Sequence, residues 1–169
     1  EKSKVGVIGF PISHSKSPDM HNFFIEKHQL SARYHAYEVS SKSLSDFVQI
    51  AKAERWIGFN ITIPHKQAII PFLDHADDMV TTIQACNTVI IKDQQLYGYN
   101  TDVYGFMEHL NNSAPSWKTK KGGITIIGAG AMGSAFSVPC LENKNDVTLA
   151  GTHLEDDLID NIRFKKNFH

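Results

Sequence analysis

Runs of apolar residues typical of β-strands alternate with segments of helical periodicity along most of the chain. Strands are expected at residues 4–9, 33–39, 57–62, 124–127 and 146–150, and a hairpin at 88–99 around a turn at 93–95. Helices are expected at residues 17–29, 43–54, 101–110, 131–143 and 154–165. A further helical segment at 69–83 is expected to be divided into two pieces by Pro71. Such alternation favours a mostly parallel sheet, because each parallel connection must cross over the sheet and a helix makes the crossing. The expected fold class is therefore α/β, with ligands bound beyond the carboxyl ends of the strands.

A change of composition separates two parts of the chain. Residues 111–123 read NNSAPSWKTKKGG, a polar stretch rich in residues that interrupt helices and strands. This stretch is the best candidate for a boundary, and a second unit of alternating strands and helices follows it.

Charge and composition exclude several classes of function. Eighteen acidic and 17 basic side chains leave a net charge of -1, so no overall positive field attracts nucleic acid or an anionic membrane. No apolar run reaches the roughly 20 residues that span a bilayer. Cys86 and Cys140 stand apart, and the nine histidines lack the spacing of a metal-binding helix. We expect a cytoplasmic protein with a small-molecule partner and no metal, and the sequence leaves the oligomeric state open.

A glycine-rich motif follows the expected strand at 124–127 and opens a helix. The motif consists of Gly128, Ala129, Gly130, Ala131, Met132 and Gly133. In a dinucleotide site the first glycine permits a tight turn, the second lets the backbone approach a pyrophosphate, and the third allows close packing of helix on strand. The context favours dinucleotide binding over the alternative, a plain glycine-rich turn.

The cofactor type depends on the residues after the next strand, at 146–150. Here Gly151, Thr152 and His153 stand where an acidic residue usually holds the ribose of NAD. The absence of that acid favours NADP, while Glu155 and Asp156 keep NAD as an alternative.

Two loops after strands carry polar side chains. In GFPISHSKSP, residues 9–18, Ser15 and Ser17 precede a helix and form a place for an anion, or else serve only as loop and capping residues. In GFNITIPHK, residues 58–66, Asn60 and Thr62 share one face of a strand. Polar groups on such a face need partners, whereas Lys66 taken alone fits a solvated surface charge equally well.

Asparagine, threonine and aspartate recur around the expected hairpin. Asn87 precedes its first strand, and Thr101 and Asp102 follow its second strand at the start of a helix. Asp102 either takes part in a site or only offsets the helix dipole.

Taken together, these segments resemble the shikimate dehydrogenase family. GFPISHSKSP, GFNITIPHK, ACNTV and YGYNTD occur in that family's order and spacing over residues 5–106. The resemblance implies an enzyme of aromatic amino-acid biosynthesis that reduces 3-dehydroshikimate to shikimate with NADPH. It also implies a substrate-binding domain over residues 1–104 and the start of a Rossmann nucleotide-binding domain over residues 105–169. Two strands do not complete a six-stranded nucleotide sheet, so the second domain is expected to be truncated and the chain to be a fragment.

The resemblance also implies roles for individual residues. Ser15 and Ser17 would hold the substrate carboxylate, and Lys66 and Asp102 would form the catalytic pair. The residues expected to contact ring hydroxyls are Asn60, Thr62, Asn87, Thr101 and Asp102. An ammonium group such as that of Lys66 can stabilise the negative charge that grows on a ketone oxygen and can protonate it.

Departures from the family leave alternatives open. Val103 replaces a usual glycine, and Thr152 stands where an arginine would hold the adenosine phosphate. Residues 124–169 also resemble the opening of the NAD(P)-dependent glycerol-3-phosphate dehydrogenases. The alternatives are a quinate-type relative, a truncated fragment that binds without turnover, and a glycerol-3-phosphate enzyme, the last disfavoured because its substrate domain is absent.

Overall fold

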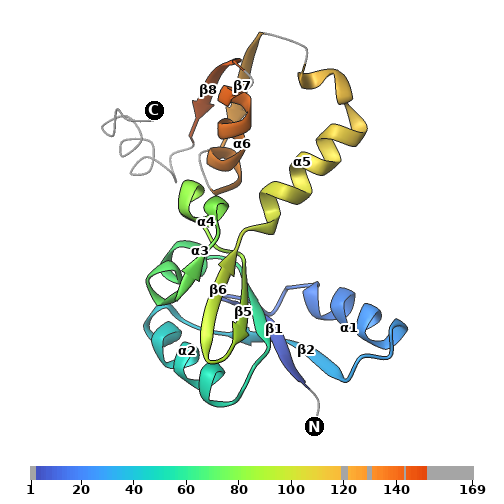
Figure 1. Ribbon diagram of the computed structural model, residues 1–169, viewed down its shortest axis with the longest axis vertical. Helices are drawn as coiled ribbons and strands as arrows, with labels where there is room; N and C mark the ends of the chain where they lie inside the picture. Colours follow the sequence, from blue (N-terminus) through green and yellow to red (C-terminus); the bar gives the residue numbers. More distant parts are fainter. Residues whose placement is uncertain (1–2, 119–121, 129–130, 143, 152–169) are drawn as a thin grey trace. The chain divides into compact units, whose positions relative to one another are not determined.

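A computed structural model describes residues 3–118, 122–128, 131–142 and 144–151. The chain divides into two compact units, residues 1–101 and 102–169. This division lies close to the expected domain boundary at residue 104 and away from the polar stretch at 111–123. Each unit is described by itself below (Figure 1).

A six-stranded sheet forms the first unit. Its strands are β1 (Ser3–Gly9), β2 (Ala32–Glu38), β3 (Gly58–Ile61), β4 (His75–Ala76), β5 (Thr88–Lys92) and β6 (Gln95–Tyr99), in the spatial order β2-β1-β3-β5-β6-β4. The pairs β1–β2, β1–β3 and β4–β6 are parallel, and only β5 runs antiparallel to its neighbours β3 and β6. The expected α/β class with a mostly parallel sheet is confirmed.

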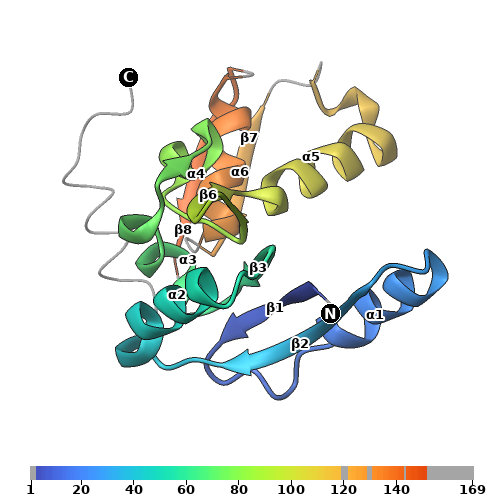
Figure 2. The same cartoon turned by 60° about the horizontal axis from the view of Figure 1, so that its bottom comes forward.

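Helices cover the two faces of this sheet. Helix α1 (Ser17–Lys27) packs beside β2, and α2 (Leu44–Ala53), which follows a short 3₁₀ turn at Ser41–Ser43, lies on the opposite face (Figure 2). Alternation along β1 explains the division, because successive side chains of a strand point to opposite faces. Val7 joins the cluster on the α1 side with Tyr34, and Ile8 joins the cluster on the α2 side.

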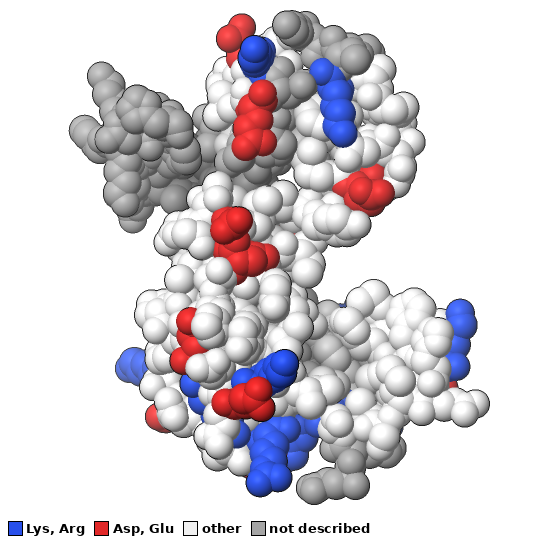
Figure 3. All heavy atoms as spheres, in the orientation of Figure 1, with Lys and Arg blue, Asp and Glu red and all other residues white. Residues whose placement is uncertain are grey.

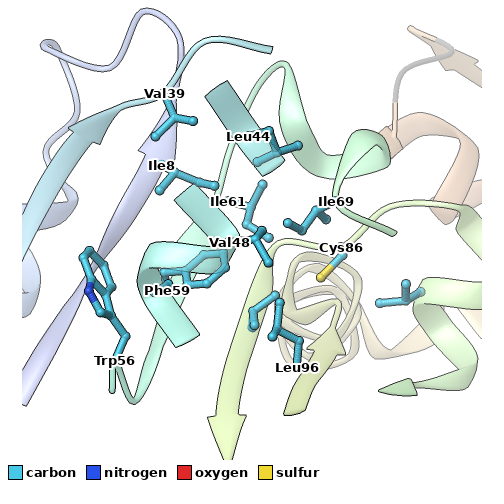
Figure 4. Close-up of a cluster of buried hydrophobic side chains, with 13 residues drawn as sticks. Ile8, Val39, Leu44, Val48, Trp56, Phe59, Ile61, Ile69, Cys86 and Leu96 are labelled. Atoms are coloured by element: carbon cyan, nitrogen blue, oxygen red, sulfur yellow. The ribbon is translucent and has the colours of Figure 1, made fainter. Parts of the chain in front are cut away.

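The larger core cluster lies between α2 and the sheet. Val48 from α2 packs with Ile8, Phe59 and Ile61 from β1 and β3 (Figure 4). Trp56 and Phe47 close this cluster with ring centroids 5.3 Å apart in an edge-to-face arrangement. The core thus fixes β1 and β3 side by side and places their carboxyl ends at one edge of the sheet.

The segment at 69–83 differs from the expected pair of helical pieces. A short helix α3 (His65–Ala68) begins earlier, and a 3₁₀ turn (Ile70–Phe72), strand β4 and helix α4 (Asp78–Ile83) follow. The side chain of Asp77 caps α4 by accepting a hydrogen bond from Val80 N at 2.7 Å. Periodicity could not reveal β4, because a strand of two residues depends wholly on its partner β6.

Two smaller boundaries also differ. Helix α1 has Lys16 at its N-cap, so Ser17, expected as the cap, is its first helical residue. The hairpin turn consists of Asp93 and Gln94, both with left-handed φ angles of 51° and 61°, and Gln95 belongs to β6. A two-residue turn of this kind matches the twist of the two strands.

The described part of the second unit contains the helices α5 and α6 and a parallel strand pair. Helix α5 (Thr101–Ser113) follows β6 in the chain, and a 3₁₀ turn (Pro115–Lys118) comes after it. Strand β7 (Gly123–Ile127), helix α6 (Ala131–Glu142) and strand β8 (Asp146–Ala150) then form a βαβ element. The helix expected at 154–165 lies outside the described residues.

The charges of the first unit are mixed in sign. Figure 3 shows Lys and Arg side chains next to Asp and Glu side chains on the face drawn, and two ion pairs, Lys4–Glu54 at 2.9 Å and Lys52–Asp74 at 3.1 Å, join such neighbours. Within the described part of the chain, no helix has both the length and the apolar character needed to cross a membrane.

The core packing leads to a first prediction. Replacing Val48→Ala removes apolar volume from a side chain that is 2% exposed, and we expect the free energy of unfolding to fall by about 2 kcal/mol. Ile50→Ala is the matched control on the same helix, because Ile50 is 50% exposed and its loss should change stability by less than about 0.5 kcal/mol. Urea denaturation followed by tryptophan fluorescence measures both, and equal losses would contradict this description of the core.

Candidate functional site

The loops that follow β1 and β3 lie together at one edge of the sheet. Phe10 N donates a hydrogen bond to Ile63 O at 3.1 Å, and Thr62 N donates to Ile8 O at 3.0 Å. A β-carbon at Gly9 would lie 2.6 Å from the Thr62 methyl carbon, so only glycine permits this approach. The structure therefore joins two of the segments that the sequence singled out.

Ser15 and Ser17 lie at the start of α1. Ser17 N donates to Ser15 Oγ at 3.3 Å, and Ser15 N donates to Ile12 O at 3.0 Å. Lys16 and Asp19 are 3.9 Å apart, and both side chains are largely exposed, so this pair contributes little to stability. The serines thus order the first turn of the helix, and their part in carboxylate binding stays a prediction.

A row of side-chain hydrogen bonds crosses the sheet from β2 to the start of α5. Tyr34 OH donates to Asn60 Oδ1 at 2.7 Å, and Asn60 Nδ2 donates to Thr88 Oγ1 at 3.0 Å. Thr88 Oγ1 donates to Asn87 Oδ1 at 2.9 Å, and Asn87 Nδ2 donates to Thr101 Oγ1 at 2.9 Å. We call these five residues the polar row. Three of its members, Asn60, Asn87 and Thr101, are predicted substrate-binding residues that the fold brings together.

Asn87 is the most constrained member of the polar row. Its side chain is almost buried, and its Oδ1 also accepts a hydrogen bond from Thr101 N at 3.0 Å. The first turn of a helix has backbone N–H groups without partners inside the helix, so Asn87 satisfies one of them for α5. Asn100 holds the same junction from the other side by donating to Ala85 O at 2.9 Å.

The segment that carries Lys66 is anchored next to Asn87. Cys86 N donates to Lys66 O at 2.8 Å, and the Lys66 side chain is half-buried. The neighbouring His65 is fully buried, and its Nε2 lies 2.6 Å from Val39 O. Because a carbonyl only accepts, that nitrogen carries the proton. His65 therefore ties α3 to the end of β2, while the catalytic role of Lys66 stays a prediction.

Asp102 follows Thr101 as the second residue of α5 and is half-buried. It is the first residue of the second compact unit. Its pairing with Lys66 in catalysis stays a prediction.

The nucleotide motif shows two features expected of a dinucleotide site. Gly128 has a φ angle of 103°, which glycine adopts readily, and its N–H donates to Ala150 O at 2.7 Å. A β-carbon at Gly133 would collide with Gly128 O, so glycine permits the close packing of α6 on this turn.

The remaining cofactor residues are described only in part. Gly151 is exposed after β8, and Ala131 and Met132 begin α6. Ala129, Gly130, Thr152 and His153 lie outside the described residues, and their roles stay predictions.

Burial shifts the pKa values of groups in and next to the polar row. Desolvation raises the pKa of the Tyr34 phenol well above its usual range and raises the pKa of the Cys86 thiol. Desolvation also lowers the pKa of His21, whose ring stacks on Tyr34 with centroids 4.2 Å apart. The Tyr34 phenol therefore remains a hydrogen-bond donor at neutral pH.

A hollow of about 520 Å³ opens on the α1 side of the sheet. Its lining is largely apolar, and its polar members include His21, Tyr34, Asn60 and Thr88. Among the described residues, no group of three or more His, Cys, Asp or Glu side chains is placed to hold a metal ion.

Sequence reasoning missed the roles of Tyr34, His65 and Thr88. The alternation at residues 33–39 indicated only a strand, and it gave no partner for the Tyr34 hydroxyl. Only the order of β2, β1 and β3 in the sheet brings Tyr34 within reach of Asn60.

Comparison with known proteins shows which proteins the chain is similar to. Residues 7–89 match the family model of the shikimate dehydrogenase substrate binding domain. The resemblance to the shikimate dehydrogenase family seen in the sequence is confirmed, and the chain is related to that family.

Individual relatives agree with this assignment. A shikimate dehydrogenase (NADP(+)) of Methylocella silvestris is 36% identical over 85% of this chain and 51% of its own length. One of Bacillus cereus is 44% identical over 80% of this chain and 48% of its own length. The crystal structure of shikimate dehydrogenase from Aquifex aeolicus is 34% identical, with a TM-score of 0.85 over 96% of this chain and 60% of that one. The chain thus spans about half the length of the curated relatives it matches.

The polar row leads to a second prediction. Asn87→Ala leaves the Thr101 N–H and the Thr88 hydroxyl without their shared acceptor, and we expect the free energy of unfolding to fall by about 1–3 kcal/mol. Asn112→Ala, at an exposed position of α5, is the control and should change it by less than about 0.5 kcal/mol. Denaturant titration of both variants measures the difference, and an Asn87 variant as stable as the control would show that the row does not stabilise the fold.

Proposed function

We propose that the protein catalyses the NADP-dependent, reversible reduction of 3-dehydroshikimate to shikimate, a step of aromatic amino-acid biosynthesis. The polar row carries this proposal, because it collects hydroxyl and amide groups at the sheet edge where the Lys66 segment is anchored. The names of the relatives support it, as do neighbouring structures described as complexes with shikimate, with NADP(H) and shikimate, and with shikimate and NAD.

Residues 1–104 would bind the substrate in this proposal. Ser15 and Ser17 would bind the carboxylate, since serine hydroxyls and the N–H groups at the start of α1 attract an anion. The residues that would contact ring hydroxyls are Asn60, Thr62, Asn87, Thr101 and Asp102. Anchoring of these groups by backbone and side-chain hydrogen bonds would hold them ready before the ligand arrives.

Residues 105–169 would begin the nucleotide-binding domain. The cofactor residues would be Gly128, Ala129, Gly130, Ala131, Met132, Gly133, Gly151, Thr152 and His153. Gly128 and Gly133 suit this role, because Gly128 has a positive φ angle and a β-carbon at Gly133 would collide with Gly128 O. NADPH, when bound, supplies the hydride that adds to the ketone carbon.

Lys66 and Asp102 would complete the reaction. As the hydride arrives, the carbonyl π electrons move to oxygen, and the Lys66 ammonium group would stabilise that charge and give the oxygen its proton. Asp102 would accept a hydrogen bond from a ring hydroxyl and orient the lysine. In the oxidation of shikimate, Lys66 would take the hydroxyl proton back.

The proposed setting is the cytoplasm. Cys86 and Cys140 are both free and buried, which suits a reducing compartment. The proposed partners are the two small-molecule substrates.

Turnover with candidate substrates tests the proposed function. Nicotinamide absorbance should change with shikimate and NADP, and more slowly or not at all with quinate or glycerol 3-phosphate. If the chain alone does not turn over, shikimate should still raise its unfolding temperature, because a ligand of the folded state stabilises it. Turnover with glycerol 3-phosphate but not shikimate, or no shikimate response in either measurement, would contradict the proposal.

The role of Lys66 leads to a separate prediction. Lys66→Ala should lower kcat by about 100-fold or more, because the developing charge loses its stabilising cation and its proton donor. The affinity for NADP and the unfolding temperature should change little. Lys92→Ala, at an exposed position of β5, is the control and should retain normal turnover. Near-normal kcat in the Lys66 variant would remove this residue from the mechanism.

A further inference from the structure

Hydrogen-bond directions in the polar row can be assigned from its fixed end. Thr101 N is a backbone donor, so the Asn87 atom that it contacts at 3.0 Å must be the amide oxygen. The Thr88 hydroxyl, which also contacts that oxygen at 2.9 Å, must then donate to it. Thr88 Oγ1 is therefore left to accept, and the Asn60 atom 3.0 Å from it is the amide nitrogen.

This assignment leaves the Asn60 amide oxygen facing Tyr34. The amide nitrogen of Asn60 directs its second proton toward Asn87 O at 3.4 Å, and a carbonyl can only accept. The Tyr34 hydroxyl, 2.7 Å from Asn60 Oδ1, is then the donor of that hydrogen bond. An amide oxygen has two lone pairs, so Asn60 retains one acceptor position and no spare donor.

Two neighbouring side chains of α1 hold Tyr34 in place. Its ring stacks on His21 with an interplanar angle of 16°. The Asn22 side chain fixes the Tyr34 backbone with two hydrogen bonds: Asn22 Nδ2 donates to Tyr34 O at 2.9 Å, and Asn22 Oδ1 accepts from Tyr34 N at 3.0 Å. With its side chain buried and its main chain fixed, the Tyr34 hydroxyl has a set position. Tyr34 and Asn60 both line the hollow on the α1 side of the sheet.

We propose that Tyr34 is a positioning residue for substrate binding: its hydroxyl fixes the Asn60 amide so that Asn60 offers an acceptor to a hydroxyl group of the ligand. This inference rests on the proposed function, because it takes Asn60 as a contact of a ring hydroxyl. It adds a preference for hydroxyl over carbonyl at that ring position, since a carbonyl oxygen has no proton to give. Recognition by a fixed, partly buried polar group of this kind discriminates between ligands, because the wrong ligand leaves the amide oxygen of Asn60 without a partner.

Tyr34→Phe tests the inference. The substitution keeps the ring and removes only the hydroxyl, which frees the Asn60 amide to turn. Two ligands are titrated by calorimetry: shikimate, and cyclohex-1-ene-1-carboxylate, which has the same ring and carboxylate but no hydroxyls. We expect the Kd for shikimate to rise about tenfold and the Kd for the hydroxyl-free acid to change less than about twofold. A general loss of structure would instead weaken the binding of both ligands to the same extent.

Tyr37→Phe is the matched control. Tyr37 lies on the same strand, and its ring packs against Trp56 in the cluster on the α2 side. The control variant should bind both ligands as the wild-type chain does. A Tyr34 variant that loses both ligands equally, or neither, would overturn the inference. Absence of shikimate binding by the wild-type chain would instead overturn the proposed function itself.

Thr88→Val serves if the Tyr34 variant does not fold. Valine has nearly the shape of threonine, but it cannot accept the hydrogen bond from Asn60 Nδ2. The same selective loss of shikimate affinity is expected, because the Asn60 amide loses the hydrogen bond that fixes its nitrogen. Unchanged selectivity in this variant would overturn the inference.

Discussion

The joining of β1 and β3 as parallel neighbours is the constraint on which the rest of the first unit depends. Val48, Phe59 and Ile61 pack on one face of this pair, and burial of these apolar side chains stabilises the pairing. Since side chains alternate along a strand, Asn60, between Phe59 and Ile61, must point to the other face. The core that fixes the strands thereby also fixes which side of the sheet carries the polar row.

The polar row shows how hydrogen-bonding needs and a binding site can coincide. Hydroxyl and amide groups removed from water are costly without partners, and the five residues, of which Tyr34 and Asn87 are buried, supply one another with donors and acceptors. Because each bond restricts the direction of the next, the backbone N–H of Thr101 sets the orientation of Asn87, Thr88 and Asn60. A site built in this way needs no rearrangement of its own side chains before it meets a ligand.

The βαβ element of the second unit depends on glycines rather than on polar side chains. At Gly128 and Gly133 the relevant property is the absence of a side chain, because backbone approaches backbone there. In the proposed function, the N–H groups at the start of α6 would face the pyrophosphate of the cofactor. In the proposed function, substrate recognition by directed side chains and cofactor recognition by bare backbone would thus be divided between the two units of one chain.

Much of the fold could be predicted from local pattern, and less of the site. The alternation of strands and helices predicted the α/β class. Residue type and spacing singled out the glycine-rich motif at 128–133 and the polar segments that follow β1 and β3. Tertiary structure decided the two-residue strand β4, which depends on β6, and the contact of Tyr34 with Asn60, which are 26 residues apart in sequence. The physical reason is that periodicity records which face of an element is apolar, whereas the partner of a polar group depends on the order and register of strands.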